Sequence, residues 1–174
     1  MALNKPTLNG TLYDAPSVIK CITATDSRFN IMLRSGTLIG EWDHPEYRDK
    51  SDLARLVDPR QEKQSHHFRR IYSSEPQSDG SVLILGSLKP CGPYGKYLEE
   101  SLQDPHRNTA FSIRSLCEEK RDNRTNSVIR HIKLLVTFDA VSSPGFKEAS
   151  KRYSPGTESL LEVTPDDFPR IYTP

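Results

Sequence analysis

The sequence predicts a β-rich α+β fold built on an antiparallel sheet or barrel. Short runs of β-branched and apolar residues recur along the chain and are separated by glycine, proline, asparagine and aspartate. This pattern is typical of antiparallel strands joined by turns, and few stretches have helical spacing. The predicted strands are Ser17–Thr23, Phe29–Leu33, Thr37–Glu41, Phe68–Ser73, Ser81–Leu88, Thr109–Leu116 and Ser127–Phe138.

Two stretches in the middle of the chain predict helices. Tyr94–Leu102 has apolar residues at helical spacing and is followed by Pro105. Asp52–Val57 is preceded by Ser51, a suitable N-cap, and is followed by Pro59. Segments rich in charged and turn residues predict exposed hairpin loops at Glu75–Gly80 and Glu118–Asn126.

The C-terminal region predicts a change from folded domain to tail. A short helix is expected after Pro144, over Phe146–Tyr153. From Ser154 onward the chain has four prolines and little apolar periodicity, which is typical of a mobile segment. We therefore expect a single domain over residues 1–153 and a flexible tail over residues 154–174.

Composition excludes several classes of protein. The 174 residues suit one core, and 24 basic against 23 acidic residues give a net charge of +1. This balance disfavours a nucleic-acid coat or a polybasic membrane binder. The mean hydropathy is −0.64, no apolar run approaches the roughly 18 residues of a membrane span, and the N-terminus lacks a secretory signal. A soluble intracellular protein is expected.

The cysteines indicate neither a disulfide framework nor a structural metal site. There are three, an odd number, and none forms a Cys-x-x-Cys pair. We expect no metal and no cofactor. The cysteines are Cys21, Cys91 and Cys117.

Two predicted strands carry polar side chains at positions suited to chemistry. In Ser127–Asp139 the apolar side chains alternate on one face, and Asp139 lies on the other face at the strand end. A buried carboxylate there needs a partner, because burying an unpaired charge is costly. In Thr109–Leu116 the same alternation places Ser112 and Arg114 on one side of the strand.

One of the five histidines is placed to act as a general base. His44 directly follows the strand Thr37–Glu41 and its turn, and Pro45 restricts its direction. The other four predict structural roles: an exposed strand start at His66 and His67, a turn at His106 and a half-exposed strand position at His131.

The order His44, Ser112, Asp139 predicts a nucleophilic site. A serine hydroxyl needs an imidazole to take its proton and a third group to orient that imidazole. An arginine or backbone N–H groups must also stabilise the oxyanion. The sequence has no Gly-x-Ser-x-Gly elbow around Ser112, which argues against an α/β-hydrolase.

Three segments resemble motifs of the prohead (head-maturation) serine proteases of tailed bacteriophages. Gly40–Pro45 looks like their Gly-Glu-x-x-His-Pro signature, and Ala110–Ser115 is similar to their nucleophile segment Gly-Val-Ser-x-Arg-Gly. In that second segment Ala110-Phe111 replaces Gly-Val and Ser115 replaces the last glycine. His131–Val141 resembles their late strand, which ends in Asp-x-Val, and the whole resemblance spans about residues 36–151.

This resemblance implies a fold, an activity and a set of roles. The fold would be a herpesvirus-assemblin-like β-barrel surrounded by helices. The activity would be cleavage of scaffold proteins, head proteins and the protease itself, by a homo-oligomer inside the assembling prohead in the host cytoplasm. Ser112 would be the nucleophile, His44 the base, Asp139 the orienting group and Arg114 the oxyanion support. His131 is a rival to Asp139, because herpesvirus relatives use a second histidine.

The resemblance also implies a cleavage preference. Such phage enzymes cut after glutamate in Leu/Ile-x-Glu-like sequences, and Leu160-Leu161-Glu162 in the predicted tail fits this pattern. Self-cleavage after Glu162 is therefore expected. Leu98-Glu99-Glu100 and Leu116-Cys117-Glu118 match the pattern as well.

Two alternatives from other classes remain open at this point. One is a non-catalytic capsid or scaffold-associated β-domain that has kept the fold. The other is a metal-dependent hydrolase that uses His44, Asp43 and either His66 or His67.

Overall fold

The structure is a computed structural model that describes residues 1–46, 48–124, 126–142, 145 and 149. The helix expected over Phe146–Tyr153, apart from Ala149, and the expected tail lie outside these residues. The elements in chain order are β1 (Ala2–Leu3), β2 (Leu12–Tyr13), α1 (Ala15–Thr23), α2 (Arg28–Arg34), β3 (Ile39–Glu41), η1 (Lys50–Asp52), α3 (Leu53–Val57), η2 (Gln61–Lys63), β4 (Gln64–Ser73), β5 (Val82–Pro90), α4 (Gly95–Gln103), β6 (Ala110–Arg121) and β7 (Val128–Val141).

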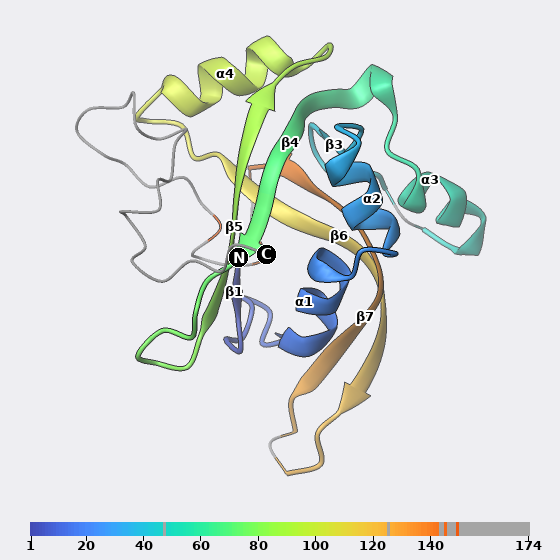
Figure 1. Ribbon diagram of the computed structural model, residues 1–174, viewed down its shortest axis with the longest axis vertical. Helices are drawn as coiled ribbons and strands as arrows, with labels where there is room; N and C mark the ends of the chain where they lie inside the picture. Colours follow the sequence, from blue (N-terminus) through green and yellow to red (C-terminus); the bar gives the residue numbers. More distant parts are fainter. Residues whose placement is uncertain (47, 125, 143–144, 146–148, 150–174) are drawn as a thin grey trace.

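The strands form two sheets that curl towards each other as a half-barrel (Figure 1). One sheet is antiparallel with the order β1-β5-β4-β3, and the other has the order β2-β7-β6, with β2 parallel to β7. The sheets meet just after β3, where Trp42 bridges Ala140 of β7. This junction brings the chain that leads to His44 beside the end of β7.

Two of the strand predictions are wrong, because Ser17–Thr23 and Phe29–Leu33 lie in α1 and α2. Both segments are rich in residues that favour strands, but each follows a side chain that caps a helix. The carboxylate of Asp14 accepts a first-turn backbone N–H at 2.9 Å, and the Ser27 hydroxyl does the same for α2 at 3.0 Å. The caps and the burial of one helical face outweigh the local β preference.

The other strand and helix predictions in the described residues are confirmed. Strands β3 to β7 and helices α3 and α4 lie where the sequence pattern places them. Two details differ. β6 continues to Arg121, so the loop expected from Glu118 begins later, and Asp49 rather than Ser51 caps the turn before α3, accepting the Ser51 N–H at 2.7 Å.

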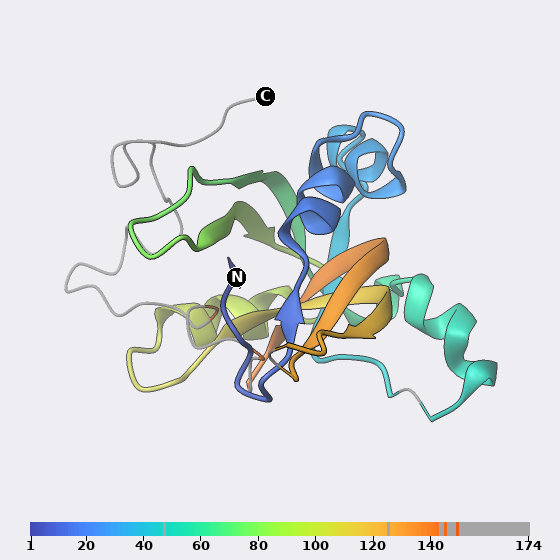
Figure 2. The same ribbon diagram turned by 90° about the horizontal axis from the view of Figure 1, so that it is seen from below.

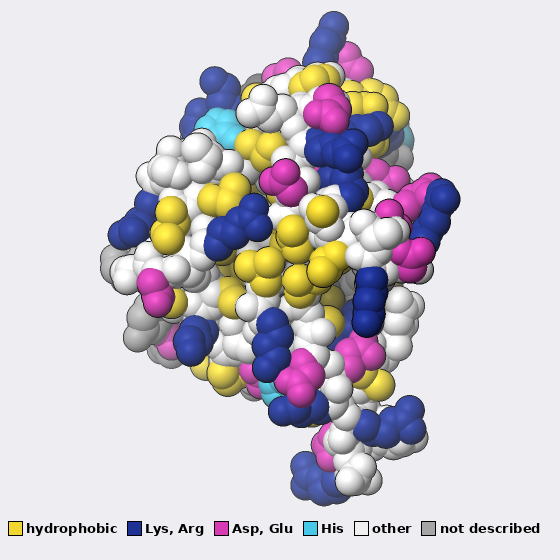
Figure 3. Space-filling view, turned by 90° about the vertical axis from the view of Figure 1, so that its right-hand side faces the viewer, with side chains coloured by type: hydrophobic (Ala, Val, Ile, Leu, Met, Phe, Trp, Pro, Cys, Tyr) yellow, Lys and Arg dark blue, Asp and Glu magenta, His cyan; other side chains and the backbone are white. Residues whose placement is uncertain are grey.

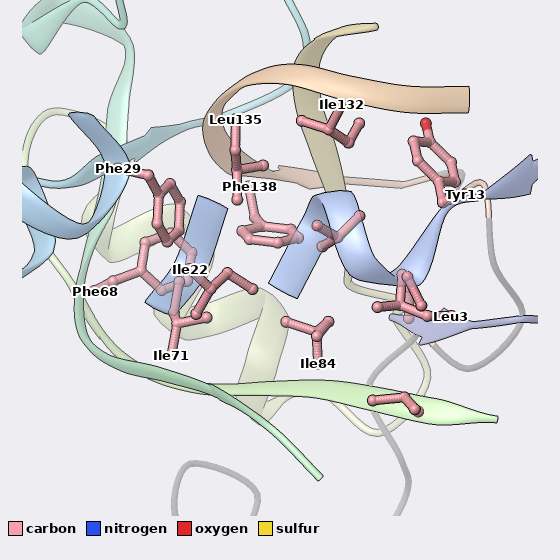
Figure 4. Close-up of a cluster of buried hydrophobic side chains, with 14 of the residues drawn as sticks. Leu3, Tyr13, Ile22, Phe29, Phe68, Ile71, Ile84, Ile132, Leu135 and Phe138 are labelled. Carbon is pink, nitrogen blue, oxygen red and sulfur yellow. The ribbon is translucent and has the colours of Figure 1, made fainter. Parts of the chain in front are cut away.

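The core lies between the two sheets, where α1 and α2 pack against β4 and β7 (Figure 4). Phe138 of β7 is its centre: its ring meets Phe29 of α2 edge-on at 6.2 Å and Phe68 of β4 at 6.1 Å. Because successive strand residues point to opposite faces, anchoring Phe138 in the core directs Asp139 away from it.

Helix α3 lies outside the core, beside β6. Figure 2 shows α3 on the side of the β6–β7 ribbon that faces away from the β4–β5 hairpin, and α3 contacts β6. Figure 3 shows a hydrophobic patch with basic and acidic side chains interspersed around it, in keeping with the balanced composition. No helix among the described residues is long and apolar enough to cross a bilayer.

Candidate active site

Asp139 is the centre of the site. It lies near the end of β7, is completely buried, and each carboxylate oxygen accepts two hydrogen bonds. Oδ1 accepts from the backbone N–H of Glu41 at 2.9 Å and from Arg114 Nη2 at 2.8 Å. Oδ2 accepts from His44 Nδ1 and from Arg114 Nε, both at 2.7 Å. Burial favours the neutral acid, but the His44 hydrogen bond and the Arg114 charge outweigh it and lower the pKa of Asp139.

His44 reaches Asp139 from the turn that follows β3. The backbone turns sharply at Asp43, which has a positive φ of 68°, and the Asp43 carboxylate accepts the His44 backbone N–H at 2.9 Å. Since an ionised carboxylate can only accept, Nδ1 of His44 is the donor to Asp139. In neutral imidazole Nε2 then carries the lone pair that can take a proton, and the side chain as a whole is 36% exposed.

Ser112 faces Asp139 across the β6–β7 ribbon. The two residues are direct partners in the antiparallel register, so their side chains lie on the same face. Cβ atoms of such partners are roughly 4.5–5.5 Å apart. The half-buried Ser112 therefore lies on the face where Asp139 holds His44. The turn after β3 brings His44 to Asp139, and the pairing of β6 with β7 places Ser112 on the same face of the ribbon as Asp139.

Arg114 lies behind this group rather than beside an open surface. Its side chain is 1% exposed and its guanidinium bridges two carboxylates, those of Asp139 and Glu41. Arg114 Nη2 is 3.1 Å from Glu41 Oε2. These contacts favour a role in holding Asp139 over the expected role in oxyanion support.

Glu41 and Arg55 complete the buried cluster and were missed in the sequence analysis. Glu41 is 1% exposed; Arg55 of α3 donates to both of its carboxylate oxygens, and the Arg60 backbone N–H donates to Oε1 at 2.5 Å. Burial favours the neutral acid, but the bonds from Arg55, Arg60 and Arg114 outweigh it and lower the pKa of Glu41. The sequence did contain a signal for Glu41. Like Asp139, it is a carboxylate at the end of an apolar strand, where packing of the strand buries the side chain.

The other histidines described below lie away from His44 and Asp139 or are buried in the core. His131 lies 3.5 Å from Asp14, towards the opposite end of β7 from Asp139, so it is no rival. His106 lies in a turn, as expected. The exposed position expected for His66 is wrong: the residue is fully buried, and its ring nitrogens lie 2.8 Å from the Ser65 hydroxyl and 3.2 Å from the Phe138 carbonyl oxygen.

A metal centre finds no support in the geometry. Among the described residues, no group of three or more histidine, cysteine or acidic side chains is arranged to hold an ion. The imidazole of His44 is engaged with Asp139, and His66 lies in the core.

Comparison with known proteins gives a family. The capsid maturation protease of Pseudomonas phage phiKZ is 28% identical over 177 residues, which cover 93% of this chain and 64% of the phage protein. The chain thus spans a little less than two thirds of that relative's length. No solved structure matches the chain. The sequence profile of the Peptidase S80 family matches residues 1–171, and the chain therefore belongs to this family.

Proposed function

We propose that this protein is a serine endopeptidase with Ser112 as nucleophile, His44 as general base and Asp139 as the group that orients His44. One observation carries the proposal: His44 Nδ1 lies 2.7 Å from the buried Asp139 carboxylate, on the face where Ser112 is the direct cross-strand partner of Asp139. Family membership and the protease named among its relatives support the same reaction class.

The reaction follows from these positions. His44 Nε2 takes the proton of the Ser112 hydroxyl as Oγ bonds to the scissile carbonyl carbon, which gives a tetrahedral oxyanion and an imidazolium. Asp139 stabilises the imidazolium without taking its proton. His44 then gives the proton to the leaving amine as the C–N bond breaks, and a water molecule, deprotonated by His44, hydrolyses the acyl-enzyme and restores Ser112.

Arg114 has a positioning role in this proposal. Its fork makes two hydrogen bonds to Asp139, at 2.7 and 2.8 Å, and fixes the plane of the carboxylate that orients His44. With these bonds made and the side chain buried, stabilisation of the oxyanion falls to backbone N–H groups.

The proposed substrates are proteins of an assembling phage capsid. The relative from phage phiKZ is a capsid maturation protease, and the present chain would process scaffold and head proteins, and itself, inside the prohead. Cleavage after glutamate and a homo-oligomeric state are parts of the same proposal, and sedimentation velocity of the purified chain checks the latter.

The decisive experiment compares Ser112→Ala with Ser115→Ala, a change of the same kind three residues along β6. Each chain is co-expressed with its scaffold protein, and the fragments are identified by mass spectrometry. Because loss of a triad nucleophile costs several powers of ten in rate, Ser112→Ala should leave the scaffold intact, and Ser115→Ala should process it.

A second measurement separates the alternatives. A fluorophosphonate probe should label the wild-type protein at Ser112, and His44→Gln should reduce the labelling rate at least about a hundredfold. Unchanged scaffold processing by Ser112→Ala would contradict the proposal. Loss of processing with EDTA would favour a metal-dependent hydrolase, and absence of both processing and labelling would favour a non-catalytic β-domain.

A further inference from the structure

The cluster behind Asp139 contains two charged residues, besides Arg114, that the proposed triad does not use. We propose that Glu41 and Arg55 are positioning residues, which hold Arg114 against Asp139 and set the net charge that His44 experiences. This inference rests on the proposed function, since it assigns these residues to the same site.

A continuous chain of ionic contacts links α3 to the imidazole. Arg55 of α3 binds Glu41 of β3 with both terminal nitrogens, and Glu41 binds Arg114 of β6 at 3.1 Å. Arg114 binds Asp139 of β7, which binds His44. The Glu41 backbone N–H also donates to Asp139, so the same residue supports Asp139 directly and through Arg114. Residues of α3, β3 and β6 thereby hold one carboxylate of β7.

The charges in this cluster balance. Two carboxylates, those of Glu41 and Asp139, face two guanidinium groups, those of Arg114 and Arg55. Three of the four side chains are at most 1% exposed and that of Arg55 is 19% exposed, so water screens them poorly. Adding or removing one charge here therefore changes the cost of placing a proton on His44.

Other ionisable groups around the cluster lie on separate elements and stay unchanged in the test. They are Asp43 in the turn before His44, buried His66 of β4, whose charge state couples to Asp139, and Glu62 of η2, whose charge acts on Arg55. Arg60 contributes a backbone N–H to Glu41 and its side chain pairs with Glu62. None of these four side chains links Glu41 to Asp139.

The proposal predicts shifts of opposite sign. Glu41→Gln leaves the cluster with an excess positive charge, which opposes protonation of His44 and moves the acid limb of the pH–rate profile to lower pH. Arg55→Met leaves an excess negative charge and moves the acid limb to higher pH. Each shift should be about 0.5–1 pH unit. The double variant Glu41→Gln/Arg55→Met is neutral again, and its acid limb should return towards that of the wild type.

The rate of fluorophosphonate labelling at Ser112 gives this profile without a known substrate. At the optimum pH, Glu41→Gln should also label at least about tenfold more slowly, because Arg114 loses its anchor. Glu118→Gln and Lys133→Met are matched controls: they form an exposed pair at 2.9 Å, six residues from Ser112 on β6 and from Asp139 on β7, and should leave the profile in place.

A second readout keeps the inference separate from the proposed function. The titration midpoint of the His44 side chain, followed by NMR and assigned with His44→Gln, should move with the same signs even in a chain that does not label. If the wild type labels but neither midpoint nor profile moves, or both variants shift in one direction, the inference fails and the triad stands. If the midpoints move but Ser112 never labels, the proposed function fails instead. If Glu41→Gln does not fold, Arg55→Met alone tests the inference, because its acid limb and its His44 midpoint should both move to higher pH.

Discussion

At the scale of single residues, the site depends on carboxylates that stay ionised although they are buried. Burial favours the neutral forms of Asp139 and Glu41, but their hydrogen bonds and the arginine charges lower both pKa values. The stability that these groups contribute is fully present above their unfolded-state pKa values of about 4 and is lost as pH falls through their lower folded-state values. Neither changes the stability between pH 7 and about pH 5.

His66 is the residue that should lower stability in that interval. Desolvation lowers the pKa of its imidazole from 6.5 to about 4, since the ring is fully buried against the rings of Phe68 and Phe111. Below pH 6.5 His66 binds a proton in the unfolded chain, whereas in the folded chain it binds one only below about pH 4. Acid therefore favours unfolding. Between pH 7 and pH 4.5 the wild type should lose about 2 kcal/mol more stability than His66→Gln.

Urea unfolding of both chains at the two pH values measures this difference. His106→Gln, at an exposed position in a turn, is the control and should lose as much stability as the wild type. Equal losses for the wild type and His66→Gln would show that His66 does not titrate in this way.

At the scale of elements, β3 illustrates why a glycine precedes the buried glutamate. A Cβ atom at Gly40 would overlap the His66 ring and the Phe138 carbonyl oxygen, so β3 approaches β7 closely only with glycine there. The next residue, Glu41, donates its N–H to Asp139, and two positions earlier the Ile39 carbonyl accepts the Thr137 hydroxyl at 2.6 Å. The close approach of β3 therefore builds one side of the site.

Gly40→Ala should disturb both the fold and the site. Overpacking at a position closed by backbone costs about 3 kcal/mol, which lowers the Tm measured by circular dichroism. The shift of β3 should also slow labelling of Ser112. At Gly145 an added Cβ meets nothing within 4 Å, so Gly145→Ala is the control and should leave both measurements unchanged. A Gly40→Ala chain as stable as the wild type would exclude this packing argument.

The elements also show what sequence patterns can and cannot predict. Strand alternation placed Asp139 opposite the core face of β7 and placed Ser112 and Arg114 on one side of β6; both follow from local periodicity. The direction of the Arg114 guanidinium depends on Glu41, 73 residues away in the chain, and no local pattern contains that partner. Likewise α1 and α2 were predicted as strands because caps and packing, rather than propensity, decide short segments.

At the scale of the whole molecule, the sequence predicted an α+β fold, and the two sheets with the helices packed against them agree with this class. The parallel pairing of β2 with β7 was not predicted, since a two-residue strand has too little pattern to be recognised. The junction between the sheets was not predicted either, because it depends on one bridge, Trp42 to Ala140, between segments far apart in the chain.

The same molecular view separates the four sequences that match the cleavage pattern ending in glutamate. Ile39-Gly40-Glu41 lies in β3, where Glu41 is buried and paired. Leu98-Glu99-Glu100 lies in α4, where Leu98 is completely buried, and Leu116-Cys117-Glu118 lies in β6, where it pairs with β7. A protease needs an extended peptide with free backbone groups, so none of these three segments is a substrate while the protein is folded. Leu160-Leu161-Glu162 lies outside the described residues and is the remaining proposed site of self-cleavage.

Self-cleavage after Glu162 should remove residues 163–174. Intact-mass measurement of wild-type protein from infected or co-expressing cells should find a chain that ends at Glu162, whereas Glu162→Gln should keep Pro174, because a neutral amide lacks the charge that the proposed preference requires. Glu158→Gln, four residues earlier, is the matched control and should be processed as the wild type. Ser112→Ala separates self-cleavage from the action of a host protease: a Ser112→Ala chain that still ends at Glu162 was cut by another enzyme.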